Sequence, residues 1–258
     1  MIQRPHDQLR PITITRNFTS TPAGSVLWQQ GGTILLVTAS ITQELPPWMS
    51  ENKPGGWITA EYVMLPASTP RRKDWPKIGH TDSRGTEIQR LIGRSLRAVI
   101  DLSKIGPHTI AVDCQVLQAD GGTRTAAISA AYVALVDAMA KLPREMPLPR
   151  TASSSTAGKS ARYDSQFYDP SNALLDQLAA VSVGIVDGKL YLDLDYPLDS
   201  RAEVDMNVAY TKEGKFVELQ GSAEGAKGFD RDATNQMLDL AISGCRQIME
   251  HQDRALVR

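Results

Sequence analysis

The chain has 258 residues, of which 41% are hydrophobic and 22% charged, and its 28 basic and 29 acidic side chains give a formal net charge of −1. This length can bury a full core, and the composition is typical of a globular protein. The nearly balanced charge excludes binding of polyanions through overall charge, so a nucleic-acid site must come from local clusters. No apolar run could span a membrane and the first residues have no apolar signal core, so we expect a cytoplasmic protein.

The N-terminal part of the chain is predicted to form strands, followed by a basic loop. Apolar and alternating stretches indicate strands over residues 12–15, 24–28, 33–40 and 57–62, with Gly31-Gly32 as a turn. After Pro66 comes a run of three positive charges, Arg71, Arg72 and Lys73, with Trp75 close by. The run could grip an RNA backbone while the aromatic ring stacks on a base. Such a run of positive charges more often belongs to a solvated surface loop.

The clearest amphipathic helix is predicted over residues 87–102. Its apolar residues recur at helical spacing, and Arg90, Arg94 and Arg97 form a basic stripe on the other face. That stripe is typical of a solvated or interfacial surface. Arg84 precedes the predicted helix, where it could point at a ligand near the helix start.

A glycine turn joins the next two predicted elements, a strand over 108–117 and a small-residue helix over 125–142. The turn reads Gln-Ala-Asp-Gly-Gly-Thr-Arg-Thr, residues 118–125. Its two glycines allow a tight turn, Thr123 can cap the helix, and Arg124 offers a forked donor to phosphate. Free N–H groups at a helix start also attract anions. A plain turn with a solvated arginine explains the local pattern equally well.

The rest of the chain is predicted to be a long loop followed by strands and a final helix. Prolines and serines indicate a surface loop from 143 to about 172. Strands are predicted over 179–186, 189–196, 204–210 and 216–220, and a helix over 230–250. The order of elements indicates an α+β fold with mixed sheets, loosely arranged as two similar halves.

Four carboxylates lie close together in the sequence, at Asp195, Asp199, Glu203 and Asp205. The pair Asp199 and Asp205 could hold Mg²⁺ or Mn²⁺, which prefer oxygen ligands, or could protonate a leaving hydroxyl. Solvated acids in a turn are the simpler explanation, and Asp193 with Asp195 resembles the wet face of a strand. The scattered histidines and the two cysteines form no zinc motif.

Taken together, these stretches resemble the ribonuclease PH family of phosphate-dependent exoribonucleases. The matching segments span nearly the whole chain in order: 4–11, 56–62, 87–97, 118–125, 179–186, 202–207 and 218–225. The resemblance implies an α+β ribonuclease PH-type fold (ribosomal protein S5 domain 2-like), shared with polynucleotide phosphorylase and exosome ring subunits. It also implies one domain over 1–258 with two similar halves, a long inserted loop at 143–178, and a homohexamer built as a trimer of dimers.

The resemblance further implies a reaction and the residues that perform it. The family's phosphate site carries over onto Arg84, Gly122, Thr123 and Arg124, and its catalytic, metal-associated acids carry over onto Asp199 and Asp205. The expected reaction is reversible phosphorolysis from the 3′ end of RNA, which releases nucleoside diphosphates. Inorganic phosphate is the co-substrate, Mg²⁺ or Mn²⁺ the metal, and transfer-RNA precursors the substrate, with ribosomal RNA as a second one. Asp205 is expected to assist the departing 3′ oxygen.

Some positions depart from the family pattern and leave two other functions open. Ala67 and Trp75 stand where arginines are usual, and Leu198 replaces a usual acid, so RNA contacts on Arg71, Arg72 and Lys73 could be shifted. One alternative is a catalytically inactive RNA-binding ring subunit, although the phosphate and acid positions that such a subunit would have lost are intact. The other is a metal-dependent hydrolytic ribonuclease that uses the same acids with water.

Overall fold

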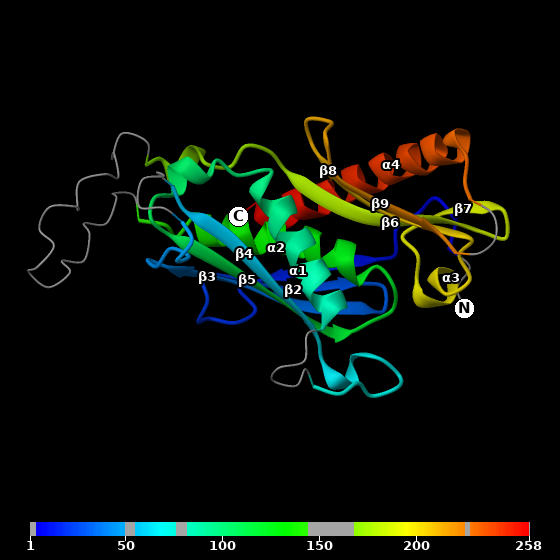
Figure 1. Cartoon of the computed structure of the whole chain (residues 1–258), viewed down its shortest axis with the longest axis horizontal. Helices are drawn as coiled ribbons and strands as arrows, with labels where there is room; N and C mark the ends of the chain where they lie inside the picture. Colours follow the sequence, from blue (N-terminus) through cyan, green and yellow to red (C-terminus); the bar gives the residue numbers. More distant parts are fainter. Residues whose placement is uncertain (1–3, 50–54, 76–81, 144–167, 225–227, 258) are drawn as a thin grey trace, which may run out of the picture.

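The computed structural model describes residues 4–49, 55–75, 82–143, 168–224 and 228–257, and two β-sheets form its framework (Figure 1). The first sheet has the strand order β1-β2-β3-β5-β4, with β4 parallel to β5 and the other neighbours antiparallel. Its strands are β1 (Ile12–Arg16), β2 (Gly24–Gln30), β3 (Thr33–Thr42), β4 (Trp57–Met64) and β5 (Thr109–Gln118).

The second sheet is antiparallel throughout and has the order β7-β6-β8-β9. Its strands are β6 (Leu178–Val186), β7 (Lys189–Leu192), β8 (Val204–Thr211) and β9 (Phe216–Ala223). Helices α1 (Ser83–Arg97), α2 (Thr123–Met139), α3 (Tyr196–Asp199) and α4 (Arg231–Leu256) pack around both sheets, with the short 3-10 turns η1 (Pro66–Ser68), η2 (Leu102–Ile105) and η4 (Pro170–Asn172).

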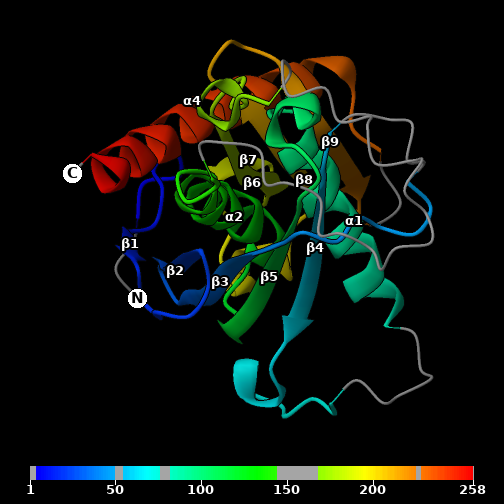
Figure 2. The ribbon, with the colours of Figure 1, turned by 90° about the vertical axis from the view of Figure 1, so that its left-hand side faces the viewer.

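Helix α2 lies between the sheets and is part of both cores (Figure 2). It packs against β2 and β3 on one side and against β6 on the other, and all its residues except Arg124 and Val136 are buried. The alanines of α2 let its backbone approach the neighbouring strands closely. The Ser129 hydroxyl accepts a hydrogen bond from the Ala180 N–H at 2.9 Å and is 3.1 Å from the Ala180 carbonyl. Helix α2 is therefore held by both sheets.

The two other long helices pack on different strands, and α1 lies beside α2. Helix α1 packs on β4 and reaches β9, whereas α4 packs on β6 and reaches β1. Arg97 at the end of α1 stacks over the Trp57 ring at 4.4 Å and donates to the Ile58 carbonyl, so one member of the predicted basic stripe is structural. None of the helices in the described part of the chain has the length and apolar character needed to cross a membrane.

The predicted strands and helices are confirmed, but several of their ends differ. Helix α1 begins at Ser83, earlier than predicted, because Asp82 caps it by accepting from the Gly85 N–H at 3.0 Å. Arg84 therefore lies within the first turn of α1 and not before it. The helix also ends at Arg97 and not at residue 102, and α4 continues to Leu256.

The predicted return strand over 189–196 is wrong at its end, because β7 stops at Leu192. Asp193 has a left-handed φ of +56°, and its side chain is only 1% exposed and paired with arginines, so it does not belong to a wet strand face. Asp195 then caps α3 by accepting from the Leu198 N–H at 3.0 Å.

Of the predicted loop over 143–172, residues 144–167 lie outside the described residues, and 170–172 form the single turn η4. The division of one domain into two similar halves, with 143–178 as an inserted loop, stays a prediction.

The contact between β2 and α2 yields a test of the central packing. A methyl group on Gly24 would lie 1.9 Å from the backbone oxygen of Ala134, so Gly24→Ala must push the strand and the helix apart. Overpacking of this kind costs about 1–3 kcal/mol, which should appear as a lower midpoint in urea unfolding. The control is Gly228→Ala, where the added methyl meets open space. Equal midpoints for the two variants would contradict this packing.

Candidate phosphate and carboxylate site

The glycine turn before α2 lies directly against the segment that leads into α3. Gly121 and Gly122 have left-handed φ angles of +74° and +65°. A side chain at Gly121 would come within 2.5 Å of the Leu194 carbonyl, so glycine is needed both for the angle and for the close approach. Thr33 donates from its hydroxyl to the Gly121 carbonyl at 2.6 Å and accepts from the Asp120 N–H at 3.1 Å.

A buried ion pair supports this turn from behind. The Arg10 guanidinium donates to both carboxylate oxygens of Asp193, at 3.0 and 2.7 Å, and the Arg10 backbone N–H donates to the same carboxylate at 2.8 Å. Arg10 also donates to the carbonyls of Asp120 and Gly121. One side chain therefore links the N-terminal segment, the glycine turn of the first sheet and the end of β7 in the second sheet.

The start of α2 offers donors to an anion, although not in the predicted way. Thr123 is the first helical residue and not the cap; the cap position is Gly122, which has no side chain to use. The Thr123 hydroxyl instead accepts a hydrogen bond from Tyr62 at 2.9 Å. The first N–H groups of a helix have no partners within the helix, so a glycine cap leaves them for a ligand.

Arg124 is held by side chains from two other elements. Its guanidinium donates to Gln220 of β9 at 2.6 Å and to Glu87 of α1 at 3.3 Å. The Gln220 amide in turn donates to the same Glu87 oxygen at 2.9 Å, which closes a ring of three residues. This ring restricts the guanidinium to the region near the start of α2.

The carboxylates approach this region from the second sheet. Asp199 ends α3, whose first N–H, from Tyr196, donates to Asp120 of the glycine turn at 3.4 Å. Asp205 lies in β8 and accepts from the Ser222 hydroxyl at 2.7 Å. The pairing of β8 with β6 and β9 sets its position.

Charged residues from three other elements act on the carboxyl of Asp199. Asp199 keeps contact with solvent, yet the protein around its carboxyl, and after that the nearby Asp205, raise its pKa above the ordinary value of 3.8. Arg84 and Arg124 act on the same carboxyl in the opposite direction. The structure thus brings Arg84, Thr123, Arg124 and the two aspartates into one cluster.

The donor set of this cluster suits one kind of metal. Within the described ranges, no group of three or more His, Cys, Asp or Glu side chains forms a complete metal site. Mg²⁺ commonly uses only one or two carboxylates and takes its other ligands from water and substrate phosphates. The pair Asp199 and Asp205 fits that pattern.

The basic loop lies beside the glycine turn and does not join the cluster. Its residues are exposed, and Arg72 pairs with the neighbouring Asp74 at 3.7 Å. The loop is anchored where the Ala119 N–H donates to the Ser68 carbonyl at 2.7 Å, next to the start of the turn. RNA binding by Arg71, Arg72 and Lys73 stays a prediction.

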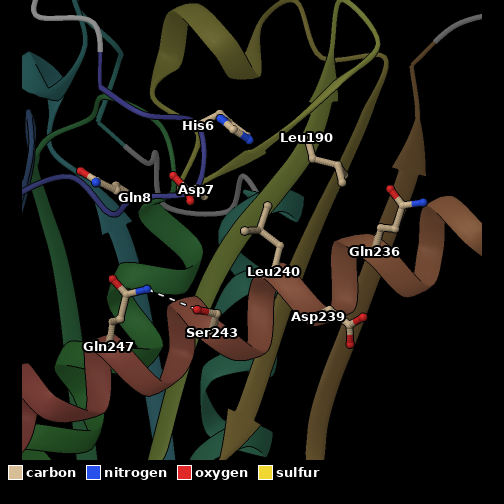
Figure 3. A pocket seen from close by; sticks show the side chains of 9 residues that line it. All are labelled: His6, Asp7, Gln8, Leu190, Gln236, Asp239, Leu240, Ser243 and Gln247. Carbon is tan, nitrogen blue, oxygen red and sulfur yellow. Dashed lines mark hydrogen bonds between the residues drawn. The ribbon is translucent and has the colours of Figure 1, made fainter.

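A cavity of about 620 Å³ lies elsewhere, between the N-terminal segment and α4 (Figure 3). Figure 3 shows side chains from the N-terminal segment facing those of β7 and α4. The lining residues are His6, Asp7, Gln8, Leu190, Gln236, Asp239, Leu240, Ser243 and Gln247. None of them belongs to the phosphate and carboxylate cluster.

Sequence reasoning missed the residues that hold the cluster together: Tyr62, Glu87, Gln220, Arg10 and Asp193. All except Asp193 lie in segments that resemble the ribonuclease PH family, which was the one available signal. Their partners are distant in the chain, so spacing alone could not reveal them.

Comparison with known proteins identifies close relatives. Residues 8–141 match the 3′ exoribonuclease family, domain 1, and residues 176–244 match its domain 2. The chain is 51% identical to ribonuclease PH of Mycolicibacterium gilvum, over 97% of this chain and 88% of that protein. It is 50% identical to ribonuclease PH of Nocardia farcinica, over 98% and 90%.

Solved structures share the fold at low sequence identity. The rice (Oryza sativa) Rrp46 structure has a TM-score of 0.70 at 18% identity and covers 98% of both chains. The Archaeoglobus fulgidus exosome with RNA bound to the active site has a TM-score of 0.71 at 22% identity, over 96% of this chain and 90% of that one.

The raised pKa of Asp199 predicts a stability effect with a defined sign. A group whose pKa is raised on folding opposes folding once it ionises, so at neutral pH the charged Asp199 destabilises the native state. Asp199→Asn should therefore raise the melting temperature at pH 7. The gain should disappear as the pH falls to about 3.8 and below, where the native and unfolded carboxyls are both protonated.

Thermal unfolding across this pH range measures the effect. The control, Asp239→Asn, removes an exposed carboxylate from α4, away from the cluster, and should change stability less. A lower melting temperature for Asp199→Asn at pH 7 would contradict the argument.

Proposed function

Because this chain belongs to the 3′ exoribonuclease family, we propose a mechanism in which the cluster at the start of α2 directs inorganic phosphate onto the 3′ end of RNA. Ribonuclease PH relatives at about half identity cover almost all of the chain. The protein is accordingly a phosphorolytic 3′-to-5′ exoribonuclease that uses inorganic phosphate as its co-substrate. The residue roles, the metal, the RNA and the assembly given below are proposals.

Inorganic phosphate binds at the start of α2. The first N–H groups of the helix and the positive end of its dipole face the anion, and Thr123 donates its hydroxyl proton. Arg124, held by Glu87 and Gln220, supplies a forked cation, and Arg84 in the first turn of α1 supplies a second. Gly122 lets the backbone approach the ligand. Two guanidinium groups and a helix start are donors suited to a dianion.

The reaction exchanges one phosphoester for another. An oxygen of the bound phosphate attacks the phosphorus of the last phosphodiester, and the bond from that phosphorus to the 3′ oxygen breaks. The products are a nucleoside diphosphate and an RNA shorter by one nucleotide with a free 3′ hydroxyl. Arg84 and Arg124 neutralise charge on both phosphates, which is the main electrostatic task in phosphoryl transfer.

Asp199 and Asp205 would hold a divalent cation, Mg²⁺ or Mn²⁺, of a kind that commonly uses only one or two carboxylates. When bound, such a cation would neutralise charge that develops on the transferred phosphate. Asp205, oriented by Ser222, assists the departing 3′ oxygen. The exposed loop with Arg71, Arg72 and Lys73 contacts the RNA backbone upstream of the 3′ end.

Solved structures with the same fold support an RNA substrate and a ring-shaped assembly. The structural neighbours include an archaeal exosome core and an exosome with RNA bound to its active site. We assign to this chain a homohexameric ring, a trimer of dimers. The RNA is the 3′ end of transfer-RNA precursors, with ribosomal RNA as a second substrate, and the location is the cytoplasm.

Both alternatives from the sequence have weaker support. An inactive ring subunit would be expected to lack phosphate or acid residues, yet Arg84, Arg124 and Asp205 are all present and lie in one cluster. A hydrolase would require water in place of phosphate, and the arginines and helix start would then have no ligand of matching charge.

Arg124→Ala tests the phosphate site. The variant loses a donor that is directed at charge in the transition state, so phosphate-dependent shortening of RNA should fall by about 10²–10³-fold. Light scattering should show an unchanged assembly. The matched control is Arg94→Ala, which removes an exposed arginine of α1 that pairs with Glu218 of β9 at 3.2 Å. Full activity in the Arg124 variant would refute the assignment.

Chromatography of the released nucleotides tests the reaction class. Nucleoside diphosphates should appear only when phosphate is present, and excess chelator should stop their release because Asp199 and Asp205 would lose the cation. Monophosphates released without phosphate would instead establish hydrolysis.

A further inference from the structure

Tyr62 places a polar group at a core position beside the proposed phosphate site. In β4, Ile58, Ala60 and Tyr62 alternate onto the buried side, and Tyr62 pairs in register with Cys114 of β5. The Tyr62 side chain is 7% exposed, so an unpaired phenol there would cost stability. Its hydroxyl is paired with Thr123, 2.9 Å away, in the first turn of α2.

The direction of this hydrogen bond matters for the ligand. A threonine hydroxyl has one proton and two acceptor lone pairs, whereas a phosphate dianion mostly accepts hydrogen bonds. Thr123 can therefore donate to phosphate only if it accepts from Tyr62. Burial raises the pKa of Tyr62, against the opposing effects of Arg84 and Arg124, so the phenol keeps its proton at neutral pH.

We propose that Tyr62 is a positioning residue for inorganic phosphate, because its hydroxyl donates to Thr123 and so turns the Thr123 proton toward the bound anion. This inference rests on the phosphate site proposed above. It assigns a role to the segment over 56–62, which resembles the family but contains none of the residues in the proposed phosphate or acid sets. Tyr62 would act on phosphate binding, through Thr123, without touching the RNA.

The variant Tyr62→Phe removes only the phenol oxygen and keeps the ring. The Michaelis constant for phosphate should rise by roughly three- to tenfold, which corresponds to the free energy that one hydrogen bond typically contributes. The turnover number at saturating phosphate and the Michaelis constant for RNA should stay near those of the unmodified enzyme. The control is Tyr132→Phe, a buried tyrosine of α2 whose phenol lies near Asp253 and Asp176, and it should change none of these constants.

A double-mutant cycle with Thr123→Val shows whether Tyr62 acts through the threonine. Residues that act in series give non-additive effects. Tyr62→Phe should therefore cause little further rise in the phosphate constant once Thr123 is already Val. An equal rise in both backgrounds would overturn the proposal.

The same measurements separate this inference from the proposed function. If Thr123→Val leaves the phosphate constant unchanged, the phosphate site itself is misassigned and the role of Tyr62 falls with it. If Thr123→Val raises that constant but Tyr62→Phe does not, the site stands and only the positioning role is refuted. A fall in turnover number for Tyr62→Phe without a change in the phosphate constant would refute it as well.

Discussion

The ion pair between Arg10 and Asp193 is the interaction on which the site depends. Both side chains are buried, and the guanidinium also binds the carbonyls of Asp120 and Gly121. Removing one member of such a pair leaves an uncompensated charge inside the protein, which typically costs about 3–5 kcal/mol. Here the loss would also release the glycine turn from the segment that leads into α3. The phosphate half and the carboxylate half of the site would then no longer be held together.

Helix α2 gives that junction a rigid base. Because it is buried between the two sheets, its position is set by packing on both sides and not by the loops around it. The proposed ligand-binding groups come from the starts of two helices, the end of a third and one strand. Sites placed on packed elements keep their geometry better than sites on free loops, which suits a reaction in which two phosphates must be aligned.

The cluster also shows how function opposes stability. Burial by the surrounding protein, and after it the nearby Asp205, raises the pKa of Asp199, so the native state carries a charge that the unfolded chain would hold more easily. Nearby, Arg124 donates hydrogen bonds to Glu87 and Gln220, and the hydroxyl of Thr123 accepts one from Tyr62. Like charges kept together in this way are typical of sites that bind a cation or stabilise a transition state.

The sequence by itself indicated the family, the candidate site residues and most strands and helices, although several ends and the short helix α3 differed. Period-two alternation in β5, the apolar stripe of α1 and the Gly121-Gly122 turn are local patterns, and local patterns can be read from neighbouring residues. Only the tertiary structure decided how those residues meet. Asp193 looked like a solvated strand residue because its partner, Arg10, is far away in the chain. Thr123 looked like a helix cap because its true partner, Tyr62, comes from the distant strand β4. Hydrogen bonds and ion pairs between distant segments depend on how the sheets pack around α2, and no spacing within the sequence encodes that packing.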